Sequence, residues 1–504
     1  MDFQSLISDC GAILPELLLS AVACLVILVD MVFPFSLSRK ICGLTALVGI
    51  VIAIILVVAG LGEESRVYFS GLIVNDHLAS VFKLIFLFGA GITVVCSLRS
   101  TEICGYRLGE YFSLLLGAVV GACLLVSSNN FIFFIIALDT LSICSYVLAG
   151  YVKHDRFSAE AALKFVLYGA VATGVMLFGI GYFYGLTGTV DIRNCMLVLA
   201  AKAASGQDGI VVLLSFLFVL VGLGYKVAMV PFHFWCPDVY QGSPTPITAF
   251  FSVVSKAAGF GALMRLLAPV FGLEVLHSSS VVLGALPVLF GVLAMITMTY
   301  GNLAALRQTN VKRLLAYSSI AHAGYLLMGF AVFTPEALEA VAMYLTVFLF
   351  MNFGAFWVVI LLINQLGGAE LERFKGVAYK APLIFGVMFL CLISLTGLPP
   401  TAGFAAKLVL FKVVIGAGIS TMDQGLLTGT AGFYFLLALL GVLNSVVSLY
   451  YYMKIVKVMV FERPDEGFTF TVSIRDGVFA VVVAAPVLLF LYFGPLIEFV
   501  KGIA

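Results

Sequence analysis

Long apolar stretches, separated by short polar breaks, make up most of this 504-residue chain. A helix needs roughly 20 mostly apolar residues to cross the hydrocarbon core of a bilayer. The pattern therefore predicts about fourteen membrane-spanning helices and leaves little chain for a soluble domain. The predicted helices cover residues 11–33, 41–61, 78–98, 111–127, 131–150, 160–186, 210–235, 247–267, 281–303, 314–332, 338–364, 383–415, 428–453 and 477–497.

Composition supports an all-α integral membrane protein, because 62% of the residues are hydrophobic and only 11% are charged. The formal net charge of +1 provides no basic face, which argues against nucleic acid as a partner and leaves lipid as the surroundings. The ten cysteines occur singly, without zinc or iron–sulfur spacing, and no glycine-rich nucleotide motif is present. The sequence thus predicts no metal or cofactor in this chain.

The loops between the predicted helices differ in their content of lysine and arginine. If the N-terminus faces outward, sixteen of the twenty-seven basic residues fall in inner loops and four in outer segments. The positive-inside rule then places both termini on the outer side of the membrane. The remaining seven basic residues lie within or at the ends of apolar segments, where a charge is costly and requires an explanation.

Three of these seven basic residues have a simple explanation. Arg265 and Lys412 lie near helix ends, and Lys83 lies about a turn and a half inside its helix. Long basic side chains at such positions extend to the headgroup region, so snorkelling is the favoured interpretation for all three. Lys83 is kept as a weaker candidate for a functional residue.

Lys226, Lys256 and Lys407 are harder to explain by snorkelling. Lys226 lies between two glycines and Pro231, and Lys407 follows the sequence GLPPTAG, so both predicted helices are interrupted near a lysine. Lys256 lies about ten residues from either end of its helix. Desolvation favours the neutral amine over the ammonium, so buried lysines can take up and release protons near neutral pH.

Three other polar residues are candidates for the same chemistry. Asp139 lies in the middle of its helix, and Lys164 lies in the next one, so either a structural ion pair or a pair that tunes proton affinity fits the sequence. His322 is the only histidine well inside a predicted helix, and its two ring nitrogens suit it to a proton relay. A hydrogen-bonded core histidine is the alternative.

The two interrupted helices hold corresponding places in two halves of the chain. Each is the fourth helix of a group of five, helices 4–8 and helices 9–13, which is typical of transporters built from repeats. Because five is odd, the second group must be inverted relative to the first. The predicted units are therefore residues 1–110, with three helices, the repeats 111–268 and 269–453, and a last helix in 454–504.

Five segments resemble a known family, the N subunits of bacterial proton-pumping NADH-quinone oxidoreductase. They read ALDTLSICSYVLAGY, AEAALKFVLYGA, VGLGYKVAMVPFHFWCPDVYQGSPTPITAFFSVVSKAAGF, NLAALRQTNVKRLLAYSSIAHAGYLLMG and SLTGLPPTAGFAAKLVLF. The resemblance implies an antiporter-like fold over helices 4–13. It also implies that Asp139 and Lys164 form a pair that tunes Lys226, that Lys256 connects toward Lys407, and that His322 lies beside this axis.

The resemblance carries further expectations. Members of this family usually have glutamate where this chain has Asp139, whose reach is shorter by one methylene group. FMN, iron–sulfur clusters, NADH and quinone would belong to partner subunits, and membrane subunits M, J and K would be neighbours in a bacterial inner membrane. An Mrp-type cation/proton antiporter subunit, which shares the fold and the lysines, is the main alternative. A passive membrane scaffold is a third.

Overall fold

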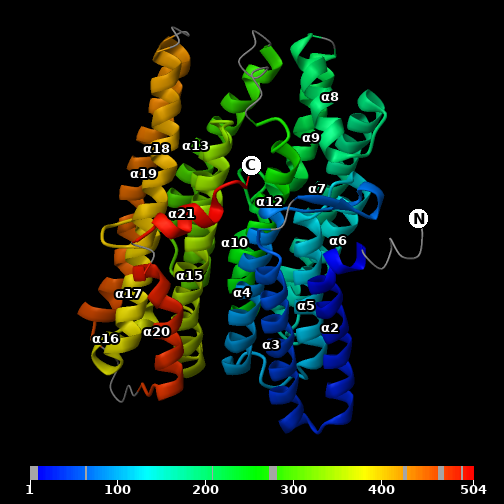
Figure 1. The fold of residues 1–504 in the computed structure, drawn as a ribbon. Helices are drawn as coiled ribbons and strands as arrows, with labels where there is room; N and C mark the ends of the chain where they lie inside the picture. The colour runs from blue at the N-terminus through cyan, green and yellow to red at the C-terminus, as the bar shows by residue number, and fades with distance from the viewer. Residues whose placement is uncertain are drawn as a thin grey trace.

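The fold was analysed in a computed structural model that describes residues 9–62, 65–206, 208–271, 281–423, 428–463, 470–489 and 492–503. Nearly all of these residues lie in helices that run roughly side by side (Figure 1). The helices are α2 (Leu14–Val32), α3 (Phe35–Ala59), α4 (His77–Arg99), α5 (Gly109–Val126), α6 (Phe131–Ala149), α7 (Arg156–Thr187), α8 (Ile192–Ala204), α9 (Gly209–Val227), α10 (Trp235–Gly242), α11 (Thr245–Phe250), α12 (Lys256–Leu267), α13 (Val281–Leu306), α14 (Val311–Phe330), α15 (Pro335–Leu366), α16 (Val377–Lys380), α17 (Pro382–Thr396), α18 (Ala402–Asp423), α19 (Thr428–Phe461), α20 (Ile474–Leu489) and α21 (Gly494–Val500).

The predicted class, an all-helical membrane protein, is confirmed. In the described part of the chain, 12 helical segments are long and apolar enough to cross a membrane, or 13 if α20 and α21 form one bent span. Helix α17 is apolar but has only 15 residues. The predicted number of about fourteen therefore differs slightly from the count by length and composition.

Both predicted interruptions are present. The segment predicted at 210–235 divides into α9, which ends at Val227, and α10, which begins at Trp235. The segment predicted at 383–415 divides into α17 and α18 on either side of residues 397–401. Gly397 has a φ of +86°, a left-handed conformation that favours glycine, and Pro399 and Pro400 follow it. The chain therefore cannot continue α17 as a regular helix.

Some local features were not predicted. Helix α8 occupies a stretch that was expected to be an outer loop, and its first turn is capped by Asp191, whose carboxylate accepts from the Asn194 backbone N–H. A short antiparallel ribbon, β1 (Arg66–Tyr68) with β2 (Ile73–Asn75), connects α3 to α4. The predicted helix 247–267 contains a π-helical turn, η2 (Phe251–Ser255), between α11 and α12. The last predicted helix, 477–497, appears as α20 and α21.

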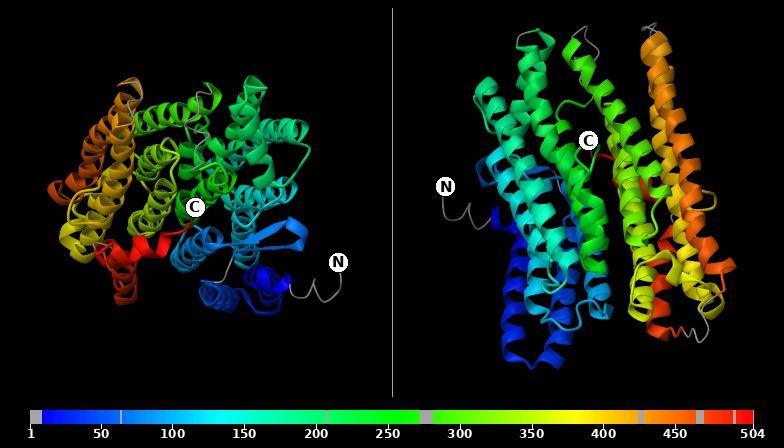
Figure 2. Two further views of the ribbon diagram at one scale, coloured as in Figure 1. Left: turned by 45° about the horizontal axis from the view of Figure 1, so that its top comes forward. Right: turned by 180° about the vertical axis from the view of Figure 1, so that it is seen from behind.

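The centre of the bundle is formed by the helices that are most deeply buried. The segment from α11 to α12 is fully buried, and 89% of the most apolar window of α15 is buried. In contrast, α2, α3, α7 and α19 have many exposed leucine, isoleucine and valine side chains, which suits a lipid-facing position. Figure 2 shows α10 to α14 (green) between the cyan helices α5 to α7 and the yellow to orange helices α17 to α19.

Candidate functional site

Lys226 lies at the end of α9, one residue before the helix stops. Its side chain is only 2% exposed, and its Nζ donates a hydrogen bond to the Ser142 hydroxyl of α6 at 3.1 Å. Asp139, one turn earlier on α6, lies within electrostatic reach of this lysine. The broken helix and α6 together hold Lys226 in the bundle interior, as its position in the sequence predicts.

Lys256 is the first residue of α12, directly after the π-helical turn η2. It is buried, and its Nζ has no hydrogen-bond partner among the described residues. The Tyr240 ring lies 5.9 Å from this nitrogen, and the neighbouring Ser255 hydroxyl also lacks a partner in the described chain. Because a buried polar group without a partner is costly, this lysine is held in place by the fold at a cost in free energy.

Lys407 lies in the first turns of α18 and is also buried. Its Nζ donates to the Thr396 carbonyl oxygen at 2.8 Å, to the Ser445 hydroxyl at 3.1 Å and to the Leu395 carbonyl oxygen at 3.3 Å. The same nitrogen lies 4.5 Å from the centre of the Tyr325 ring, which is within the range of a cation–π interaction. Lys407 therefore has far more partners than Lys226 or Lys256.

His322 lies inside α14 and is buried between tyrosines of two other helices. Its Nδ1 is 2.7 Å from the Tyr344 hydroxyl of α15, and its Nε2 is 3.3 Å from the Tyr452 hydroxyl of α19. Tyr452 also forms a hydrogen bond with Ser318. A histidine with a hydroxyl on each ring nitrogen has the geometry of a proton relay, and it is equally well held as a core residue.

Lys164 has different partners from those expected. Its Nζ lies 2.5 Å from an Asp238 oxygen on α10 and 2.6 Å from a Glu160 oxygen one turn earlier on α7. Among the described residues Asp139 forms no ion pair, so the expected pair of Asp139 and Lys164 is absent from this structure. Asp238 also accepts from Arg313 of α14 at 2.6 Å, so one carboxylate joins α7, α10 and α14. The prediction failed because it compared only neighbouring helices.

Two of the three residues assigned to snorkelling are instead buried in ion pairs. Arg265 donates to both carboxylate oxygens of Asp76, at 2.5 and 2.8 Å, and to the Val126 carbonyl oxygen. Lys83 lies 2.7 Å from a carboxylate oxygen of Glu16 on α2. The snorkelling prediction was wrong for both, because the sequence does not show which carboxylates tertiary contacts bring near. Lys412 is exposed, as expected.

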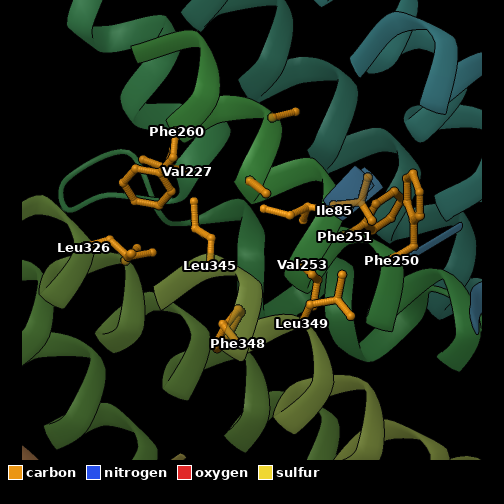
Figure 3. Packing of buried hydrophobic residues seen from close by; sticks show 14 of the residues in the cluster. Ile85, Val227, Phe250, Phe251, Val253, Phe260, Leu326, Leu345, Phe348 and Leu349 are labelled. Carbon is orange, nitrogen blue, oxygen red and sulfur yellow. The ribbon is translucent and has the colours of Figure 1, made fainter. Parts of the chain in front are cut away.

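Buried apolar side chains pack beside the helix segments that carry these residues. Figure 3 shows Val227 of α9, Phe260 of α12, and Leu345 and Phe348 of α15 packed near one another, with Leu326 of α14 beside them. All of them are buried. Such packing excludes water and keeps the local dielectric low, so each buried lysine depends on its few polar partners.

The sequence alone did not identify several partners of the predicted residues, notably Ser142, Asp238, Tyr325 and Ser445. Ser142 had a signal, because it lies three residues after Asp139 and therefore on the same face of a helix. Asp238 could also have been noticed, because it is a charged residue within the segment VPFHFWCPDVYQGSPTP. No sequence signal pointed to Tyr325 or Ser445, since each contacts Lys407 only through the packing of helices. No cluster of three metal-ligating side chains occurs in the part of the chain that the structure describes.

Comparison with known proteins agrees with this architecture. The family model described as NADH:quinone oxidoreductase/Mrp antiporter, TM, matches residues 128–452. The chain is 40% identical over 502 residues to NADH-quinone oxidoreductase subunit N 2 from Sorangium cellulosum, with 96% of this chain and 95% of the relative covered. The chain belongs to the NADH-quinone oxidoreductase subunit N family. This confirms the resemblance seen in the five sequence segments.

Chains of two solved membrane complexes have the same fold as this protein. A chain of respiratory complex I from Thermus thermophilus with bound aureothin is 30% identical, with a TM-score of 0.76, and the match covers 97% of this chain and 99% of that one. A chain of the Mrp complex from Dietzia sp. has a TM-score of 0.79 at 20% identity, with 97% and 96% covered. The second likeness concerns the fold alone.

Proposed function

We propose that this chain is the N subunit of a proton-translocating NADH-quinone oxidoreductase and that it carries protons through its bundle interior. The residues that take part in proton translocation, as carriers or by tuning a carrier, are Asp139, Lys164, Lys226, Lys256, His322 and Lys407. The observation that carries this proposal is the burial of three lysines, each only 2–4% exposed, at or beside breaks and a π-turn in membrane helices. Ionisable residues at such depth are expensive and mark ion or proton pathways.

The order of these residues along the proton path follows from the helices that carry them; we call each proton-carrying residue a station of the path. Asp238 joins Lys164 to Arg313, so α10 connects the first group of helices to α14, which carries His322. Tyr240 of the same short helix lies near Lys256 and forms a hydrogen bond with Ser319 of α14. A path from Lys226 and Lys256 to His322 and Lys407 therefore crosses the middle of the bundle. The role of Asp139 in it is electrostatic, toward Lys226.

We further propose that residues 111–268 and 269–453 are two inverted repeats, between the three helices of residues 1–110 and the last segment, 454–504. Two features support this division: each proposed repeat has one interrupted helix with a lysine at the interruption, and each begins with a closely packed helical hairpin, α5 with α6 and α13 with α14. Inverted repeats place one half-channel toward each side of the membrane.

The location and partners are part of the same proposal. The subunit lies in a bacterial inner membrane with both termini on the periplasmic side, as the distribution of basic residues indicates. Subunits M, J and K are its neighbours, and NADH, FMN, iron–sulfur clusters and quinone act in other subunits. The similar chain from Thermus thermophilus belongs to respiratory complex I.

An Mrp-type antiporter subunit remains the second candidate, because it has the same fold. It is the weaker one, since the likeness to the Mrp chain rests on 20% identity, against 40% to the Sorangium relative. An antiporter would produce cation-dependent proton flux in vesicles without NADH. A scaffold would tolerate the loss of all three lysines.

The decisive experiment is the Lys226→Ala variant in the assembled complex, reconstituted in vesicles. We expect NADH-driven proton pumping to be abolished or reduced at least tenfold, because the station at the first helix break is lost. Assembly is checked by the amount of complex recovered and by NADH oxidation with an artificial electron acceptor. Normal pumping in a normally assembled variant would refute the relay.

A further inference from the structure

The end of α17 has two backbone carbonyl groups that its own helix cannot satisfy. In a regular helix the carbonyls of Leu395 and Thr396 would accept from the N–H groups of residues 399 and 400. Both of those residues are prolines and have no N–H, so the two carbonyls need another donor. The Lys407 ammonium supplies it, at 3.3 and 2.8 Å. A lysine of α18 thus caps α17, where a positive charge is favourable.

The opposite side of Lys407 is closed by α14 and α19. Ser445 accepts the third hydrogen bond at 3.1 Å, and the Tyr325 ring lies 4.5 Å from the nitrogen. The Tyr325 hydroxyl in turn accepts from Ser445 at 3.3 Å and from the Asn302 amide at 3.4 Å. Tyr325 is fully buried, so these contacts fix its ring against the lysine.

The space around Lys407 is also limited from the side of the break. A Cβ atom on Gly397 would lie only 2.7 Å from Cδ of Lys407. Gly397 therefore provides both the left-handed turn that ends α17 and the room for the lysine side chain. We call the group formed by the Leu395 and Thr396 carbonyls, Ser445 and the Tyr325 ring the Lys407 cradle.

The Lys407 cradle offers three oxygen acceptors, which matches the three N–H donors of an ammonium group. The aromatic face adds an attraction to a cation that a neutral amine does not have. Lys226 has one hydroxyl partner and Lys256 has none in the described chain, so this arrangement is particular to Lys407. Transfer of the proton to the next carrier leaves two donors for three acceptors and removes the charge that faces the ring.

We propose that Tyr325 is a positioning residue for Lys407, whose ring closes the cradle and keeps the protonated lysine on the carbonyl end of α17. Tyr325 does not exchange the proton itself. Its ring acts by holding Lys407 at the point where the two halves of the broken helix meet. This inference rests on the proposed function, because it concerns how one station of the relay is held.

The test compares substitutions of Tyr325 in the complex, with NADH-driven proton pumping in vesicles as the measurement. Tyr325→Phe keeps the aromatic face and should retain at least half of the wild-type initial rate. Tyr325→Leu removes that face and should lower the rate about tenfold, because the ring no longer holds the lysine ammonium by a cation–π interaction. If the leucine variant does not assemble, Tyr325→Met, which fills more of the space without an aromatic face, carries the same expectation.

The matched control is Tyr451→Leu. Tyr451 is equally buried and its hydroxyl donates to Asn302 at 3.0 Å, but its ring does not cover Lys407. We expect its pumping rate to stay within twofold of wild type. Equal losses in Tyr325→Phe and Tyr325→Leu, or no loss in either, would overturn the inference, and so would an equal loss in Tyr451→Leu.

A Lys407→Ala variant separates this inference from the proposed function. Loss of pumping in Lys407→Ala with unchanged pumping in the leucine and methionine variants of Tyr325 would refute only the positioning role. Normal pumping in Lys407→Ala would refute the relay itself.

Discussion

The two broken helices of this protein hold their lysines in different ways. In the first, Lys226 lies before the break, at the end of α9, and its ammonium meets a single hydroxyl from α6. In the second, Lys407 lies after the break and extends back to the carbonyl end of α17, where two prolines have removed the usual donors. The side of the break on which a lysine lies therefore decides how many backbone partners it finds.

Lys256 has fewer hydrogen-bond partners than either of these two lysines. It follows a π-helical turn, and no hydrogen-bond acceptor among the described residues meets its nitrogen. The three lysines thus form a series with none, one and three hydrogen bonds. All three are buried, so burial by itself does not distinguish a lysine with many polar partners from one with few. The number of hydrogen-bond partners does distinguish them, and it determines what each lysine contributes to the stability of the fold.

The sharpest test of this series compares the stability of Lys407→Met with that of Lys256→Met. Lys407→Met leaves two buried carbonyl groups without a donor and should destabilise the subunit by about 2–6 kcal/mol, at about 1–3 kcal/mol for each group. Lys256→Met removes a buried group that has no described partner, so it should be neutral or slightly stabilising. The measurement is the thermal midpoint of the purified complex in detergent.

Both methionine variants are expected to lose pumping, so activity does not separate them. If the thermal midpoint falls equally in the two variants, the number of hydrogen bonds does not set the contribution of these lysines, and the comparison fails.

A second prediction concerns the room for Lys407. Gly397→Ala places a methyl group 2.7 Å from Lys407 Cδ and forces alanine into a left-handed conformation. The two effects together should cost about 2–4 kcal/mol and reduce pumping severalfold. Gly386→Ala is the matched control on α17, since nothing lies within 4 Å of its Cβ position. That variant should be neutral or more stable by up to about 1 kcal/mol.

Equal behaviour of the two alanine variants, measured by thermal midpoint and by pumping, would mean that the break tolerates a side chain. The close approach of Gly397 to Lys407 would then have no consequence for the second broken helix.

The smallest expected effect concerns the C-terminal end of α12, the helix that begins with Lys256. Burial alone would raise the pKa of Asp76, but the charge and hydrogen bonds of the Arg265 guanidinium outweigh burial and hold this pKa below its ordinary value of 3.8. The ionised pair therefore stabilises the fold at neutral pH, and its contribution disappears as the pH falls through the folded-state pKa. Asp76→Asn should cost on the order of 1–2 kcal/mol near pH 7.

This difference in stability between wild type and Asp76→Asn should persist down to about pH 5 and shrink below about pH 4. Thermal midpoints measured across this range provide the test. A difference that stays constant with pH would show that the carboxylate charge at Arg265 is not what anchors α12.

Much of the fold could be predicted from the sequence, because the signals involved are local. Apolar stretches of spanning length predicted the membrane helices, and the Gly/Pro sequences around Lys226 and Lys407 predicted the two breaks within a few residues. The motif blocks predicted the family, which the comparisons confirm. Helix α8 and the β1–β2 ribbon were missed, since short elements in polar connections have weak periodicity.

Pairing among charged and polar side chains was determined only by the tertiary structure. The sequence alone determined that Lys226, Lys256 and Lys407 lie deep in membrane helices, because depth follows from position within an apolar stretch. It did not determine that Lys164 meets Asp238, that Arg265 meets Asp76, or that Tyr325 covers Lys407. Those partners are 74, 189 and 82 residues apart along the chain. Only the packing of helices brings such residues together, and the strength of each contact depends on distances of a few ångströms.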